Sequence, residues 1–68
     1  MITDVILYPD NISFYDLNGY GNISIYLPDY LSGPYNVESY TEEQIVITNG
    51  EKRATFDRHG DLVSMDDV

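Results

Sequence analysis

Residues 11–26 read NISFYDLNGYGNISIY, and this stretch decides the fold. The dipeptide Asn18-Gly19 lies between two runs rich in β-branched and aromatic residues, which favour strands. Asn-Gly is typical of a two-residue type I′ turn, because both central positions need a positive φ that Asn tolerates and Gly adopts freely. The stretch therefore predicts a β-hairpin closed at Asn18-Gly19.

The register that this turn implies divides the hairpin into two chemically different faces. The apolar face would carry Ile12, Phe14, Ile23, Ile25 and Leu27. The opposite face would carry Ser13, Tyr15, Ser24 and Tyr26. Because side chains alternate along a strand, a slip of one residue would mix the two sets. Turn chemistry and facing pattern thus predict the same hairpin.

A second dipeptide, Asn49-Gly50, predicts another hairpin further along the chain. As a two-residue turn it would place Ile45 opposite Ala54. A further turn near His59-Gly60 would add a third strand and complete a meander. We expect one apolar face in this meander, formed by Ile45, Ile47, Ala54, Phe56, Val63 and Met65.

The remaining segments predict further short strands. Residues 2–8 indicate an opening strand that ends at Pro9-Asp10, and residues 35–40 indicate another. Residues 41–44 (TEEQ) resemble a helix capping box, but β-branched residues follow at once, so at most one turn of helix fits. The predicted fold is one all-β domain over residues 1–68, a small antiparallel sandwich or partly open barrel of five or six short strands.

Charge is the most unusual property of the composition. Twelve acids oppose three bases, for a net charge of −9 in 68 residues. Residues 1–51 contain no Lys or Arg, and Lys52, Arg53 and Arg58 all come later. Phosphate binding rests on Lys and Arg, so the composition disfavours direct contact with nucleic acid or an anionic membrane. It favours a basic protein partner, attracted over a long range.

Cysteine is absent, so neither disulfides nor cysteine-based metal sites are available to the chain. The 43% hydrophobic content is enough to build a small core and argues against disorder. The first residues contain no basic region typical of a signal peptide, and no apolar run approaches the ~20 residues that span a bilayer. We therefore expect a soluble, cytoplasmic protein.

Residues that could support catalysis are few. The single histidine, His59, lies in a predicted turn, and a trio of Ser64, His59 and Asp57 can be assembled in almost any short chain. Asp57, His59 and Asp61 offer alternating oxygen and nitrogen ligands for a metal, but a solvated turn is the favoured interpretation. We predict no enzyme activity, no cofactor and no metal site.

The seven tyrosines all precede residue 41, in the part of the chain that lacks positive charge. Two interpretations stay open for those outside the core: they cover or pack the sheet, or they form a contact surface. Tyrosine beside carboxylate also suits an arginine-rich partner. The predicted partner-binding residues are Tyr15, Asp16, Tyr20, Tyr26, Asp29, Tyr30 and Glu38.

These features together predict a non-enzymatic protein-binding module. Its expected role is an inhibitor that occupies a basic nucleic-acid-binding surface on a host protein, with carboxylates imitating phosphates. Small, acidic, cysteine-free inhibitors of the anti-CRISPR or anti-restriction type occur in phages and mobile elements, which is an analogy of composition. The alternative is a structural or assembly subunit that forms a small β homo-oligomer, since a small core and open edge strands favour association.

Overall fold

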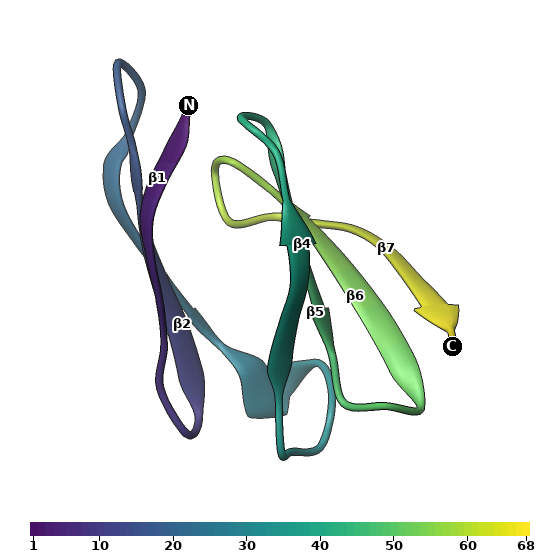
Figure 1. The fold of residues 1–68 in the computed structure, drawn as a ribbon. Helices are drawn as coiled ribbons and strands as arrows, with labels where there is room; N and C mark the ends of the chain where they lie inside the picture. Colours follow the sequence, from purple (N-terminus) through teal and green to yellow (C-terminus); the bar gives the residue numbers. More distant parts are fainter.

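Two antiparallel β-sheets, packed face to face, make up the computed structural model, which describes all 68 residues (Figure 1). The first sheet has the order β1-β2-β3 and the second β4-β5-β6-β7. The seven strands are β1 (Ile2–Leu7), β2 (Asn11–Asp16), β3 (Gly21–Tyr26), β4 (Asn36–Tyr40), β5 (Gln44–Thr48), β6 (Lys52–Asp57) and β7 (Leu62–Asp67). The all-β antiparallel prediction is confirmed. The strands number seven instead of five or six, and the open sheets form a sandwich.

The core fills the space between the two sheets and draws on both. Phe14 of the first sheet and Phe56 of the second are its largest members. Full burial of such a side chain contributes roughly 1.5–3 kcal/mol, so a few residues supply most of the stability of a domain this small. The ten buried apolar residues are Ile2, Ile12, Phe14, Ile25, Leu27, Leu31, Ile45, Ile47, Ala54 and Phe56.

The hairpin of β2 and β3 has the predicted register. Ile12 lies opposite Ile25, and Phe14 lies opposite Ile23. The predicted apolar face of this hairpin is therefore confirmed, with Ile23 packed at the margin of the core.

The turn of this hairpin differs from the predicted type I′ turn. Asn18 has a φ of 61°, but Gly19 is not in the left-handed region. The Gly19 N–H donates to the Asp16 carbonyl oxygen at 3.1 Å, and the Tyr20 N–H donates to the Asp16 carboxylate at 3.0 Å. A Cβ on Gly19 would overlap that carboxylate, so close approach is what requires glycine here.

The hairpin of β5 and β6 pairs two residues away from the predicted register. Ile45 lies opposite Phe56 instead of Ala54. Because the shift is even, every side chain keeps its face, and all three of these residues are buried. The predicted separation of faces is right although the predicted pairs are wrong.

The shift arises because four residues, 49–52, separate the paired residues Thr48 and Arg53, in place of the two of a type I′ turn. The Asn49 Oδ1 accepts hydrogen bonds from the Glu51 N–H at 2.9 Å and the Lys52 N–H at 2.8 Å. Gly50 takes the positive φ, 91°, whereas Asn49 does not. Asn49 thus acts through its side chain, as an Asx turn, and the type I′ prediction is wrong at this position too.

A β-bulge in β7 corrects the prediction for Val63. Met65 lies opposite Ala54, but Phe56 then pairs with Leu62, so Val63 is the extra residue. One extra residue in a strand changes which face the side chains on its far side point to. Val63, expected in the core, is 52% exposed.

No helix forms at residues 41–44. The Thr41 Oγ1 accepts hydrogen bonds from the N–H groups of Glu43 and Gln44, at 3.3 and 3.2 Å, and so caps a turn between β4 and β5. The single helical element is a 3-10 turn, η1 (Leu27–Asp29), in the connection between the sheets. Pro28 favours it because its fixed φ suits the first turn of a helix.

The two sheets also meet at their margins. The Ile2 N–H donates to the Glu42 carbonyl oxygen at 2.9 Å, which joins β1 to the loop before β5. On the other side, Gly60 lies against Ile23 and Ile25, where a Cβ would meet Ile23 at 2.9 Å. Chain segments far apart in sequence therefore gather at the upper end of the molecule in Figure 1: the N-terminus and the turns after β2, β4 and β6.

Candidate functional site

The outer face of the first sheet carries two of the predicted contact residues. Tyr15 lies opposite Asn22 and Tyr26 lies opposite Asn11, on the side away from the core. Their exposed fractions are 37% and 54%. Tyr15 and Asn11, the residue opposite Tyr26, are four positions apart in β2. At about 3.4 Å per residue the two tyrosines therefore stand roughly 14 Å apart along the sheet. The pair of Ser13 and Ser24 lies between the two tyrosines on this face.

The paired residues on this outer face are uncharged, and two carboxylates lie at its margin: Asp4 Oδ2 accepts from the Thr3 hydroxyl at 3.3 Å, and Asp10 Oδ1 accepts from Asn11 Nδ2 at 2.7 Å. Residues directly opposite each other in antiparallel strands lie on one face, which extends the surface to β1. We call this surface the tyrosine face; its members are Thr3, Ile6, Asn11, Ser13, Tyr15, Asn22, Ser24 and Tyr26. The two Asn-Ile-Ser repeats, at residues 11–13 and 22–24, were the sequence signal for its polar members.

The structure removes Asp16 from the predicted contact surface. Its side chain is buried, with 1% of the residue exposed, and points to the same side as Ile12 and Phe14. The N-terminal ammonium of Met1 donates to Asp16 Oδ1 at 2.7 Å. That ammonium, together with the Tyr20 N–H, holds the pKa of Asp16 below its usual range. Asp16 is a structural ion that closes the β2–β3 turn.

The other predicted residues lie apart from one another. Tyr20, on the turn after β2, packs edge-on against His59 with ring centroids 4.3 Å apart. The Tyr30 ring packs edge-on against the core residue Phe56, at 5.0 Å. Asp29 is exposed in η1, three residues after Tyr26. Neither ring contact involves a member of the tyrosine face, so these positions do not form one cluster with it.

Glu38 lies in the second sheet and is paired. The Arg53 Nη2 donates to Glu38 Oε1 at 2.8 Å, and Arg53 Nε lies 2.5 Å from Oε2. This contact raises the pKa of Arg53. Glu38 therefore offers a partner less free charge than its sequence position implied.

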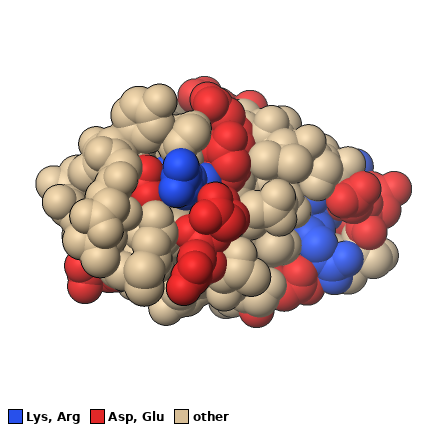
Figure 2. Space-filling model, turned by 90° about the horizontal axis from the view of Figure 1, so that it is seen from above, with Lys and Arg blue, Asp and Glu red and all other residues tan.

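The same pairing extends to all the bases. Every basic side chain lies within ion-pair distance of a carboxylate: Lys52 of Asp67 (2.8 Å), Arg53 of Glu38 (2.5 Å) and Arg58 of Glu43 (3.8 Å). On the face seen in Figure 2, each blue area is bordered by red side chains. Eight acids have no such cation: Asp4, Asp10, Asp29, Glu42, Glu51, Asp57, Asp61 and Asp66. The chain thus presents unpaired negative charge and no unpaired basic side chain.

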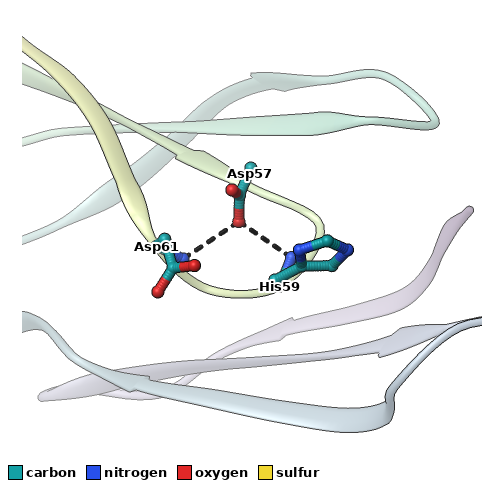
Figure 3. Close-up of side chains that lie close together, drawn as sticks. All are labelled: Asp57, His59 and Asp61. Atoms are coloured by element: carbon teal, nitrogen blue, oxygen red, sulfur yellow. Dashed lines mark hydrogen bonds between the residues drawn. The ribbon is translucent and has the colours of Figure 1, made fainter.

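Asp57, His59 and Asp61 come together in the turn after β6, with potential ligand atoms within 4.8 Å of one another (Figure 3). Asp57 Oδ1 accepts the backbone N–H groups of both other residues, at 2.9 and 3.0 Å. The His59 Nε2 accepts a hydrogen bond from the Arg58 Nε at 3.2 Å. Two of the three groups are already engaged and a guanidinium is adjacent, so the geometry is that of a side-chain-capped turn.

The chain matches no family model, no curated protein and no solved structure. No pocket opens on its surface. None of its helical structure is long and apolar enough to cross a membrane. The candidate site is therefore defined by its own geometry: a tyrosine face whose paired residues are uncharged, with Asp4 and Asp10 at its margin, on a molecule whose charged side chains without an ion-pair partner are all acidic.

Proposed function

We propose that this chain is a non-enzymatic protein-binding module whose partner presents a basic surface. The observation that carries the proposal is the internal pairing of every basic side chain beside eight acids without a cation partner. Such a molecule attracts basic proteins over a long range and repels nucleic acid. Approaching Lys and Arg side chains gain charge-assisted hydrogen bonds to carboxylates.

The tyrosine face supplies the centre of the contact. Interface centres are depleted in charge and enriched in tyrosine, while their rims stay polar and solvated. Tyr15 and Tyr26 offer rigid apolar area with a hydroxyl at low entropic cost. An uncharged centre also avoids the desolvation penalty that buried carboxylates would impose. The acids then act mainly on encounter rate and partner choice.

A nucleic-acid-binding protein is the partner class that fits this chemistry best. Surfaces that bind phosphates carry the Arg and Lys side chains that carboxylates can occupy. The proposed role is inhibition by nucleic-acid mimicry, of the kind found in phage and mobile-element inhibitors, and its proposed setting is the cytoplasm.

The experiment is capture of proteins from a nuclease-treated host lysate on the immobilised chain, followed by elution with added DNA or RNA. We expect nucleic acid to release the captured protein, and we expect capture to weaken from about 0.1 M to about 1 M salt, where the Debye length falls from ~10 to ~3 Å. Tyr15→Ser and Tyr26→Ser should reduce capture. Tyr40→Ser is the matched control, because Tyr40 is similarly exposed but belongs to the second sheet.

Two results would overturn this proposal. A captured protein that withstands both salt and nucleic acid would exclude charge mimicry. Equal losses in Tyr40→Ser and in the Tyr15 and Tyr26 variants would exclude the tyrosine face as the contact.

A second function, self-assembly, is favoured by one observation. β7 is an edge strand, and Leu62 and Val63, at its bulge, are exposed. Exposed edges pair readily with another chain. Because each copy carries −9, assembly should strengthen as salt rises, opposite to the first proposal. Sedimentation velocity at low and high salt distinguishes the two: a monomer under both conditions excludes self-assembly.

A further inference from the structure

The two Asn-Gly bonds of the chain lie in opposite chemical environments. Asn18 is exposed, and its carboxamide makes no hydrogen bond. The Asn49 carboxamide makes three: Oδ1 accepts from Glu51 and Lys52, and Nδ2 donates to the Ser32 carbonyl oxygen at 2.9 Å. One side chain is free to rotate and the other is fixed at both of its polar atoms.

An Asn-Gly bond can react with itself in water. The backbone nitrogen of the glycine loses its proton and attacks Cγ of the asparagine, so that a C–N bond forms, the Cγ–Nδ2 bond breaks and ammonia leaves. Water then hydrolyses either carbonyl of the resulting succinimide to aspartate or isoaspartate. Glycine favours the attack because it has no Cβ to hinder the approach.

We propose that Asn18 is a site of spontaneous deamidation in the folded protein and that Asn49 is protected. At Asn18 the attacking Gly19 N–H makes one hydrogen bond, to the Asp16 carbonyl oxygen at 3.1 Å, and the Asn18 side chain has none to lose. Asn49 must first lose its three side-chain hydrogen bonds, and the Gly50 N–H must leave the Thr48 Oγ1 at 3.0 Å. Local opening of this kind costs more where more bonds hold the loop.

The other three asparagines do not compete. Asn11, Asn22 and Asn36 are followed by isoleucine or valine, whose branched Cβ blocks the approach of the backbone nitrogen. They also lie in strands, where the backbone is held by pairing. Asn18 is thus the one asparagine with both a glycine neighbour and a free side chain.

The reaction would change the upper end of the molecule. A new carboxylate would appear on the turn that carries Tyr20, and the isoaspartate form would add a methylene to the backbone beside Gly19. This inference is independent of the proposed function, because it depends only on the two turns.

The test follows asparagine deamidation over time in the folded chain at mildly alkaline pH and 37 °C. Cleavage after glutamate separates the two sites, because Glu38, Glu42 and Glu43 lie between them. Mass spectrometry then follows the conversion at each site, and isoaspartate is identified by its separate elution. We expect Asn18 to convert at least roughly tenfold faster than Asn49, since several net hydrogen bonds separate the two.

Two controls make the result decisive. In concentrated guanidinium chloride the two rates should become similar, because both asparagines then precede a glycine in an open chain. Asn18→Gly keeps the left-handed backbone and should abolish the fast phase. Equal rates in the folded chain, or a faster Asn49, would overturn the assignment. So would a folded chain whose Asn18 stays intact while the unfolded chain reacts.

Discussion

The two Asn-Gly hairpins share a dipeptide and differ in almost everything that the dipeptide does. In the β2–β3 turn the backbone of Asn18 is left-handed, with a φ of 61°, and its side chain is free. In the β5–β6 turn Gly50 takes the positive φ, and the Asn49 side chain caps the loop. Asn-Gly fixes where each chain reversal occurs, but it does not fix the conformation.

Neighbouring acceptors decide between the two conformations. The first turn has the Asp16 carboxylate, anchored by the N-terminal ammonium, which accepts the Tyr20 N–H. The second has the Thr48 hydroxyl, which accepts the Gly50 N–H and leaves capping to Asn49. The difference lies in the N–H of the residue after the glycine. In the first turn the Asp16 carboxylate accepts it and Asn18 contributes only its backbone conformation, whereas in the second turn the Asn49 side chain accepts it.

The largest expected effect is that of removing the anchor of the first turn. Asp16→Asn keeps the shape of the side chain but removes its charge, so the Met1 ammonium loses its ion-pair partner. We expect the greatest loss of stability among the substitutions considered, because breaking a pair with a buried carboxylate is costly. Urea denaturation at pH 7 measures the difference from the unaltered chain.

The pH dependence identifies the cause of that loss. Because the folded pKa of Asp16 is lowered, its contribution is complete above the ordinary aspartate pKa, about 4, and is lost as the pH falls through the lower folded value. The stability gap between Asp16→Asn and the unaltered chain should therefore close in acid. Asp67→Asn is the matched control, since that exposed carboxylate also has a lowered pKa but should change stability little. A gap that persists in acid would refute the ionic explanation.

Alternation made the fold predictable even where the pairing was wrong. Four residues in place of two between the last paired positions of β5 and β6 shift the register by an even number, so Ile45 and Phe56 remained in the predicted core. A bulge changes the count by one, and nothing in the sequence of β7 revealed it. For that reason Val63 was placed on the wrong face.

The same rule predicted half of the candidate site. Tyr15 and Tyr26 were placed outside the core by alternation, and the structure bears this out. Alternation also places Asp16 inside with Phe14, so its place among the predicted contact residues was wrong. The ion-pair partner of Asp16 is the N-terminal ammonium of Met1, a cation that a count of Lys and Arg side chains leaves out.

The second prediction compares the two glycines. Gly19→Ala should cost about 1–3 kcal/mol, because the new Cβ overlaps the Asp16 carboxylate. Gly50→Ala meets no atom within 4 Å and should cost about 1–2 kcal/mol through its left-handed backbone alone. In an Asp16→Ala background the cost of Gly19→Ala should largely vanish, and that of Gly50→Ala should not change. A double-mutant cycle measured by urea denaturation tests this, and additive costs at Gly19 would exclude the overlap.

The smallest changes in stability are expected when the asparagine of each turn is replaced by glycine. Asn49→Gly should cost about 1–2 kcal/mol, because the loop loses its side-chain acceptor and gains backbone freedom in the unfolded state. Asn18→Gly should change stability by no more than about 0.5 kcal/mol, since relief of the left-handed backbone offsets the added freedom. Urea denaturation measures both changes in stability, from the shift of the midpoint when the dependence of the free energy on urea is unchanged. Equal costs would mean that the two asparagines act alike, and the contrast between backbone and side-chain roles would then be wrong.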